Sequence, residues 1–173
     1  MASYENKRIE PVIMSFEVII TDNLEIREML PGDRALIEEF FAQMSEKSTS
    51  FFNVNHGNEK RVLGGFDGTT KGHTFFVAVK DNSAVGIMFI WDIDKTIPWF
   101  GIAVRDNMQG QGIGSSMMNY LKAYCAENHF AGVLLRTAQT NIGAQRLYEK
   151  SGFERLGEHP SGEYLYLLRL EKR

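Results

Sequence analysis

The sequence predicts an α+β (mixed α/β) fold, in which helices flank a central mixed sheet. Segments with strand-like patterns are first separated by turns and later by helical patterns, and this order is typical of a mixed sheet covered by helices. The chain has 173 residues, of which 43% are hydrophobic. This length suits one domain with a substantial core, and we expect a single domain over residues 1–173.

Short apolar runs bounded by turn residues predict the strands of the first part of the chain: residues 16–21, 24–30, 74–79, 84–91 and 97–104. Asp22 and Asn23 favour a tight turn between the first two. Asp33 can cap the following helix, whose apolar face comprises Leu36, Ile37, Phe40, Phe41 and Met44. Residues 46–72 are polar with scattered aromatics, and we expect a short helix there within long loops.

A Gly-rich segment from Val104 to Ser115 connects the strand over residues 97–104 to a helix. The apolar face of that helix comprises Ile113, Met117, Met118, Leu121 and Tyr124. Glycine at alternate positions lets the backbone approach a ligand closely, and the unpaired N–H groups of a first helical turn favour an anion. The segment therefore predicts a site for a phosphate-bearing ligand.

Two common phosphate loops do not fit this segment. No Gly-Lys-Ser or Gly-Lys-Thr occurs in the chain, which excludes the Walker loop. The dinucleotide fingerprint would need a third glycine at Ser115 and an acidic end to the next strand, which instead ends near Arg136. A nucleotide-binding oxidoreductase domain is therefore the weakest interpretation.

The remaining part of the chain predicts a strand over residues 132–138, a helix over 141–151, and strands over 153–156 and 164–170. In the helix, Asn141 is a suitable N-cap, and Ala144, Leu147 and Tyr148 share one face. Gly152 can supply the left-handed residue that ends it.

Two motifs resemble those of the GNAT superfamily of N-acetyltransferases. Gln109 to Gly114 reads Gln-x-x-Gly-x-Gly, which resembles the family's acyl-CoA pyrophosphate loop. About thirty residues later, residues 141–153 resemble the second signature, Asn-x-x-Ala-x-x-Leu-Tyr-x-x-x-Gly-Phe. The resemblance spans about residues 24–170 and implies the GNAT acyl-CoA N-acyltransferase fold, with a mostly antiparallel sheet and one parallel, splayed strand pair. Residues 1–20 would be an extra N-terminal strand or arm.

The resemblance implies an enzyme that uses acetyl-CoA as co-substrate and transfers its acetyl group to a primary amine by direct attack on the thioester. The acceptor would be a small metabolite, an amino sugar or a peptide terminus. The cofactor-binding residues that it implies are Ile102, Ala103, Val104, Gln109, Gly110, Gln111, Gly112, Ile113, Gly114, Ser115 and Asn141. The alternative from another class is a non-catalytic acyl-CoA-binding sensor or regulatory module.

Tyr148 matches the family tyrosine that protonates the departing thiolate, although packing alone would also explain it. The general base is not identified. Arg136 stands where the ribosomal-protein-modifying branch has a glutamate, so that assignment fails. Asp92 and Asp94 are candidates, as is deprotonation through water.

The family's acceptor walls correspond here to residues 46–72, which include Phe51 and Phe52, and to the turn around His159. Aromatic rings there could hold an apolar or cationic amine, whereas the alternative is that both phenylalanines cap the core. The net charge of −3 mildly favours a cationic acceptor.

Composition and residue spacing argue against several other classes of function. A net charge of −3 does not indicate binding to nucleic acid or to an anionic membrane. No apolar run approaches the length of a helix that spans a bilayer. The four histidines lack paired ligand spacing, so no metal site is expected. Cys125 lies at helical spacing from Leu121 and Met117, which favours packing over nucleophilic chemistry. We expect a cytoplasmic protein, and a homodimer is possible.

Overall fold

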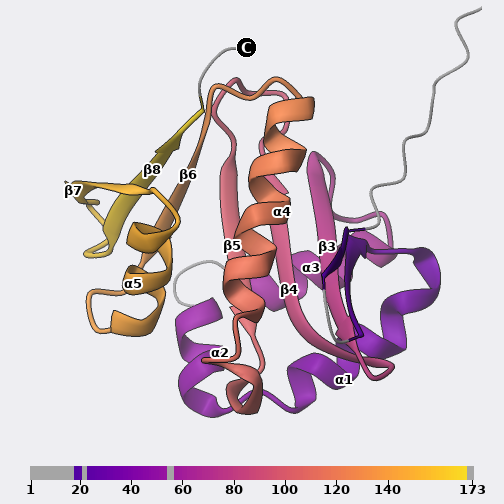
Figure 1. The fold of residues 1–173 in the computed structure, drawn as a ribbon. Helices are drawn as coiled ribbons and strands as arrows, with labels where there is room; N and C mark the ends of the chain where they lie inside the picture. The colour runs from indigo at the N-terminus through magenta and orange to yellow at the C-terminus, as the bar shows by residue number, and fades with distance from the viewer. Residues whose placement is uncertain (1–17, 21–22, 54–56, 171–173) are drawn as a thin grey trace, which may run out of the picture.

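The computed structural model describes residues 18–20, 23–53 and 57–170. Within them, one eight-stranded sheet runs in the order β1-β2-β3-β4-β5-β6-β8-β7 (Figure 1). Its neighbouring strands are antiparallel except β5 and β6, which are parallel. The predicted fold class is therefore confirmed. The strands are β1 (Val18–Ile20), β2 (Leu24–Glu28), β3 (His73–Lys80), β4 (Ser83–Trp91), β5 (Trp99–Val104), β6 (Gly132–Thr137), β7 (Glu154–Glu158) and β8 (Tyr164–Arg169).

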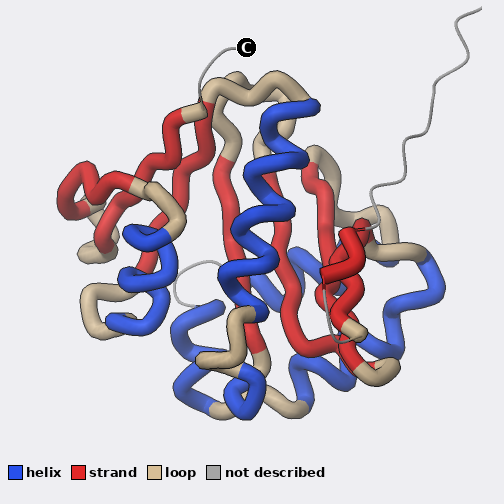
Figure 2. The backbone as a smooth tube through the Cα atoms, in the orientation of Figure 1, coloured by secondary structure: helices blue, strands red, loops and turns tan. Residues whose placement is uncertain are grey.

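Helices cover both faces of this sheet (Figure 2). They are α1 (Arg34–Ala42), α2 (Glu46–Asn53), α3 (Asn58–Phe66), α4 (Ile113–Glu127) and α5 (Ile142–Lys150), with short 3-10 turns η1 (Pro31–Asp33) and η2 (Asp106–Met108). Residues of α4 and α5 share one buried cluster with the sheet, whereas α1, α2 and α3 share another. Among the described residues, no helix combines the length and the apolar character needed to cross a membrane.

Strand β4 forms the centre of both cores. Met88 and Ile90 face the cluster of α4, and Ile87 and Phe89 face the cluster of α1. Because successive side chains of a strand point to opposite faces, a strand buried on both sides must be apolar throughout. This requirement explains the continuous apolar run of residues 84–91. Cys125 is fully buried in the cluster of α4, and burial raises the pKa of its thiol to about 12, which supports packing as its role.

Residues 46–72 differ from the expectation of one short helix within long loops. They contain two helices, α2 and α3, which pack through Phe52 and Val62 onto the core formed with α1. Both helices have a mostly polar sequence with few large apolar side chains, so their sequences carry only a weak helical period. Contact with the sheet, rather than local pattern, explains their formation.

Asp33 precedes α1 as expected, but its carboxylate makes no capping hydrogen bond there. It accepts hydrogen bonds instead from the Leu30 amide at 2.7 Å and from Arg27 at 2.6 and 3.0 Å. The hydrogen bond from Arg27 is the main reason that the pKa of Asp33 lies below its usual value. The side chain therefore ties β2 to the turn before α1, and the predicted cap is wrong.

The N-terminal strand is described only over Val18–Ile20, which pairs with β2. Residues 1–17 and the turn position Asp22 lie outside the described residues, so the predicted arm over residues 1–20 stays a prediction. The expected strands over residues 74–79, 84–91 and 132–138 are confirmed within a residue or two. The helix expected over residues 141–151 is confirmed as α5.

The parallel pair is splayed. Of the described residues in β5 and β6, only Trp99 and Leu134 are partners, and the Leu134 amide donates to Pro98 O at 2.9 Å. On its other side, by contrast, β5 pairs with β4 along its whole length. One edge of β5 beyond Trp99 therefore has no neighbouring strand, and its backbone groups are open to a ligand.

Candidate active site

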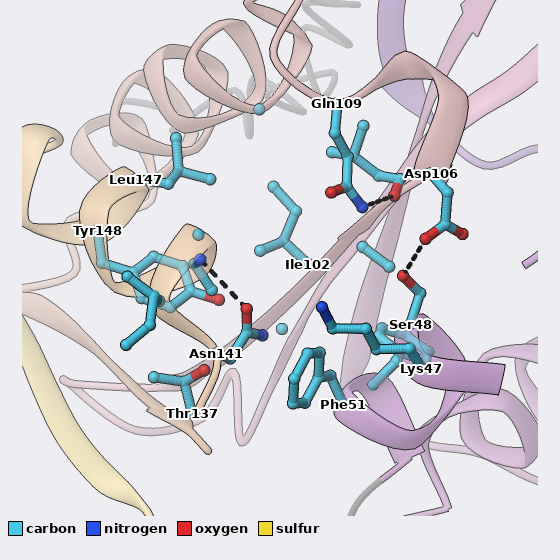
Figure 3. Close-up of a pocket in the computed structure, with 18 of the residues that line it drawn as sticks. Lys47, Ser48, Phe51, Ile102, Asp106, Gln109, Thr137, Asn141, Leu147 and Tyr148 are labelled. Carbon is cyan, nitrogen blue, oxygen red and sulfur yellow. Dashed lines mark hydrogen bonds between the residues drawn. The ribbon is translucent and has the colours of Figure 1, made fainter. Parts of the chain in front are cut away.

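A cavity of about 700 Å³ occupies the gap between the splayed strands. Its walls are residues 100–104 of β5, the Gly-rich turn before α4, the first turns of α5, the inner face of α2, and residues at the ends of β6 and β8. Figure 3 shows Ile102 at the back, with Tyr148 and Asn141 on one side and Lys47 and Phe51 on the other. Three separate elements thus face one space.

The Gly-rich turn presents backbone rather than side chains. Gly110 and Gly112 have positive φ values of 74° and 85°, which only glycine adopts easily, and Gly112 is the N-cap of α4. Gln109 donates from Nε2 to Val104 O at 3.1 Å, so it holds the turn against the end of β5. The turn therefore brings the first amides of a 15-residue helix to the cavity, a strong site for an anion.

Most of the predicted cofactor-binding residues line this cavity: Ile102, Ala103, Val104, Gln109, Gly110, Gly112, Gly114, Ser115 and Asn141. Two do not. Ile113 is buried in the core beneath α4, and Gln111 turns back to donate to Asn107 O at 2.9 Å. Any contribution of these two to a ligand would come from their backbone amides.

The opposite wall is the start of α5. Asn141 caps this helix, because its Oδ1 accepts from the Ala144 amide at 3.3 Å, and its side chain also lines the cavity. Gly152 ends the helix with φ 89°, as the sequence predicts. The Phe153 amide donates to Tyr148 O and the Gly152 amide donates to Glu149 O, each at 3.0 Å, which fixes the end of the helix.

Tyr148 lies between the core and the cavity. Only 6% of it is exposed, its ring packs against Phe153 and Tyr166, and it also lines the cavity. Burial, with a smaller contribution from Tyr166, raises the pKa of its phenol, which therefore stays protonated at neutral pH. No described residue accepts a hydrogen bond from the hydroxyl, which leaves it available to a ligand.

A third wall is α2, which lies within residues 46–72, the segment expected to border the acceptor. Lys47 and Phe51, one helical turn apart, both line the cavity. Asp106 fastens this helix to η2, since its carboxylate accepts from the Ser45 amide at 3.0 Å and from the hydroxyls of Ser45 and Ser48 at 2.9 and 2.6 Å. Although burial opposes it, these hydrogen bonds lower the pKa of Asp106.

The two aspartates considered as bases lie elsewhere. Asp92 and Asp94 are exposed in the turn after β4, Asp94 pairs with Lys95 at 2.8 Å, and neither lines the cavity. The cavity instead exposes Arg136, from β6, and Glu163, which directly precedes β8. Pairing of β6 with β8 brings these two together, and no short sequence motif could have indicated their contact.

The aromatic residues expected beside the acceptor play different parts. Phe51 lies at the cavity wall, with Lys47 Nζ 5.9 Å from its ring centroid. Phe52 touches the cavity but is only 7% exposed, and its ring packs between Phe41 and Phe89 at 5.8 and 5.9 Å. His159 does not line the cavity, and its Nδ1 lies 3.1 Å from Arg136 Nη1.

Replacing these two phenylalanines should separate their roles. Phe52→Ala should lower the free energy of unfolding by about 3–5 kcal/mol, because it leaves a void between two packed rings. Phe51→Ala should cost much less stability, since its ring borders the open cavity. Denaturant unfolding of both variants checks this, and equal losses of stability would contradict the distinction.

Comparison with known proteins agrees with this geometry. The model of the acetyltransferase (GNAT) family matches residues 34–153, more than half of the chain, and the protein therefore belongs to this family. N-acetylaspartate synthetase from Xenopus tropicalis is 30% identical over 88 residues, which cover 50% of this chain and 32% of that protein. The match thus spans about a third of that relative's length.

Solved structures show the same fold. The GNAT domain of S. lividans PAT superposes with a TM-score of 0.73 at 13% identity, over 85% of this chain and 90% of that chain. An aminoglycoside acetyltransferase in complex with coenzyme A gives a TM-score of 0.67 at 15% identity, over 86% and 95% of the two chains. Identities this low establish the shared fold alone.

Proposed function

We propose that this protein is an N-acetyltransferase that moves the acetyl group of acetyl-CoA to a primary amine. The observation that carries the proposal is the convergence of three features on one cavity. These features are the unpaired edge of β5, the amide-rich start of α4 and the buried phenol of Tyr148.

In this proposal, the pyrophosphate of acetyl-CoA binds the amides of residues 110–115, where the helix dipole favours negative charge. The pantetheine arm runs along residues 102–104 of β5 and contacts Asn141. The thioester then lies deep in the gap, with its carbonyl oxygen against the free backbone edge of β5. Amides directed at that oxygen would stabilise the negative charge that develops there.

The reaction follows from this placement. The amine nitrogen attacks the carbonyl carbon, the carbon–sulfur bond breaks, and an amide forms. The amine loses one proton and the thiolate gains one, which Tyr148 supplies from its hydroxyl. A phenol whose pKa is raised by burial is protonated before the reaction, and its position beside the cavity suits donation to sulfur.

The names of similar proteins do not identify the acceptor of this protein. One relative is named for acetylated aspartate, an acidic amine, and one structural neighbour for aminoglycosides, which are basic amines. The family thus accommodates acceptors of opposite charge.

Release of free CoA thiol from acetyl-CoA, measured over a panel of acidic, neutral and basic amines, tests the proposal. We expect amine-dependent release, with the acetylated amine identified by mass spectrometry. Tight binding of acetyl-CoA without release for any amine would favour the non-catalytic sensor module instead.

A further inference from the structure

Asp106 joins helix α2 to the 3-10 turn η2, which directly precedes the Gly-rich turn. Its carboxylate accepts from the Ser45 amide at 3.0 Å, from the Ser45 hydroxyl at 2.9 Å and from the Ser48 hydroxyl at 2.6 Å. Figure 3 shows the contact with Ser48, and it shows Lys47 and Phe51 of the same helix at the cavity. One side chain thus connects two walls of the cavity.

Helix α2 depends on this contact at its first turn. The helix has eight residues, and isolated helices this short do not persist in water. Of the side chains described in it, only that of Phe52 is buried, and Asn58 donates to Phe52 O, so both of these anchors lie at the C-terminal end. Among the described residues of other elements, Asp106 is the only one that forms hydrogen bonds with the first turn.

The carboxylate stabilises the start of α2 in two ways. Ser45 caps the helix, since its hydroxyl accepts from the Ser48 amide at 3.2 Å and its carbonyl accepts from the Thr49 amide at 2.9 Å. By accepting from the same hydroxyl, Asp106 orients this cap. In addition, its negative charge lies at the positive end of the helix dipole.

The backbone around Asp106 is tied to the Gly-rich turn. The Gln109 amide donates to Asp106 O at 3.3 Å, and Gln111 Nε2 donates to Asn107 O at 2.9 Å. The glycines of this turn leave it many backbone conformations when no anion holds it. An anion on the amides of residues 110–115 selects one of them, and it thereby fixes the position from which the Asp106 carboxylate reaches α2.

We propose that Asp106 is a positioning residue that couples the Gly-rich turn to α2, so that bound acetyl-CoA stabilises the wall that carries Lys47 and Phe51. Linkage requires the converse as well: α2 in place strengthens cofactor binding by the same factor. The α2 side of the cavity is therefore completed when the cofactor is present. This inference rests on the proposed function, which places the pyrophosphate on the amides of residues 110–115.

Hydrogen–deuterium exchange of the full chain, with and without saturating CoA, tests the coupling. CoA should slow exchange at residues 110–115, and it should also slow exchange of the α2 amides of residues 49–52 by about fivefold or more. Slowed exchange at residues 110–115 alone would overturn this inference and leave the proposed cofactor site standing. Unchanged exchange at residues 110–115 would overturn both.

Variants assign the coupling to the carboxylate. In Asp106→Ala, CoA should still protect residues 110–115, whereas its effect on residues 49–52 should disappear. Without CoA, the amides of residues 49–52 should exchange about tenfold faster than in the unmodified protein, the scale of a lost helix cap and its charge. Protection of residues 49–52 by CoA in Asp106→Ala would mean that CoA contacts α2 directly, and it would contradict the role of Asp106.

Three further variants control for this result. Asp106→Asn keeps one acceptor oxygen and should restore part of the CoA effect on α2. Ser48→Ala removes one partner of the carboxylate from α2 itself and should weaken the effect in the same direction. Asn107→Ala changes an exposed side chain of η2 that forms no hydrogen bond with the described residues, and it should behave as the unmodified protein does. Equal loss of the effect in Asn107→Ala would contradict the proposal.

Turnover gives a second measurement. With the best amine of the thiol-release panel, Asp106→Ala should raise the KM for that amine by about tenfold and leave kcat nearly unchanged. The reason is that α2 forms a wall of the cavity, whereas the proposed acid, Tyr148, lies on α5. A lower kcat with an unchanged KM for the amine would contradict the positioning role.

Discussion

Tyr148→Phe should lower kcat by on the order of a hundredfold while leaving the KM for acetyl-CoA nearly unchanged. The substitution removes the proton that the thiolate needs but keeps the ring that packs against Phe153 and Tyr166. Since no described residue accepts a hydrogen bond from the hydroxyl, the fold should lose little stability. Steady-state kinetics with a saturating amine measures the effect.

Tyr124→Phe is the matched control for this variant. Tyr124 also loses a hydroxyl, which donates to Thr74 at 3.3 Å, but it does not line the cavity. Its kcat should therefore be that of the unmodified protein. Because burial raises the pKa of Tyr148, the phenol stays protonated above the usual tyrosine pKa of about 10, and its ionisation should not lower kcat below that pH. An unchanged kcat for Tyr148→Phe would assign this residue to packing alone.

Gly112→Val should raise the Kd for acetyl-CoA by on the order of a hundredfold or more. A branched side chain cannot easily adopt φ 85°, so the turn must change and the amides of the first α4 turn are redirected. Loss of two or more hydrogen bonds to pyrophosphate, at about 1.5–3 kcal/mol each, accounts for the size of the effect. Isothermal titration calorimetry with acetyl-CoA measures it.

Gly68→Val separates backbone strain from ligand binding. Gly68 also has a positive φ, 67°, and no atom lies within 4 Å of an added Cβ at either glycine, but Gly68 does not line the cavity. Both variants should lose similar stability, and only Gly112→Val should lose the cofactor. Titrations with ATP and NAD complete the experiment. Binding of either nucleotide in place of acetyl-CoA would contradict the assignment of this turn.

The parts of the site that could be predicted are those fixed by local chemistry. The turn at Gly112 needs a positive φ, and the helix from Ile142 needs the cap of Asn141 and the left-handed Gly152. Such requirements leave a signature within a few residues of chain. For this reason nine of the eleven residues expected to bind the cofactor could be placed at the cavity from the sequence, and their binding of it stays a prediction.

The side of the cavity formed by α2, Arg136 and Glu163 could be predicted only in part. Helix α2 is positioned by Asp106, far along the chain, and Arg136 meets Glu163 only because β6 pairs with β8. The expected cap at Asp33 is wrong for a related reason. Its carboxylate accepts a hydrogen bond from Arg27, which lies on the other side of a turn. Contacts between distant segments leave no periodic or motif signal in the sequence.

The central claim is that acetyl-CoA lies in the gap between β5 and β6, and a crystal structure of its complex tests this most directly. We expect the pyrophosphate oxygens within hydrogen-bond distance of the amides of residues 110–115. The thioester carbonyl should lie against the free edge of β5, and the sulfur should face the hydroxyl of Tyr148. Acetyl-CoA bound on another surface, or bound in the gap with its sulfur remote from Tyr148, would contradict the account.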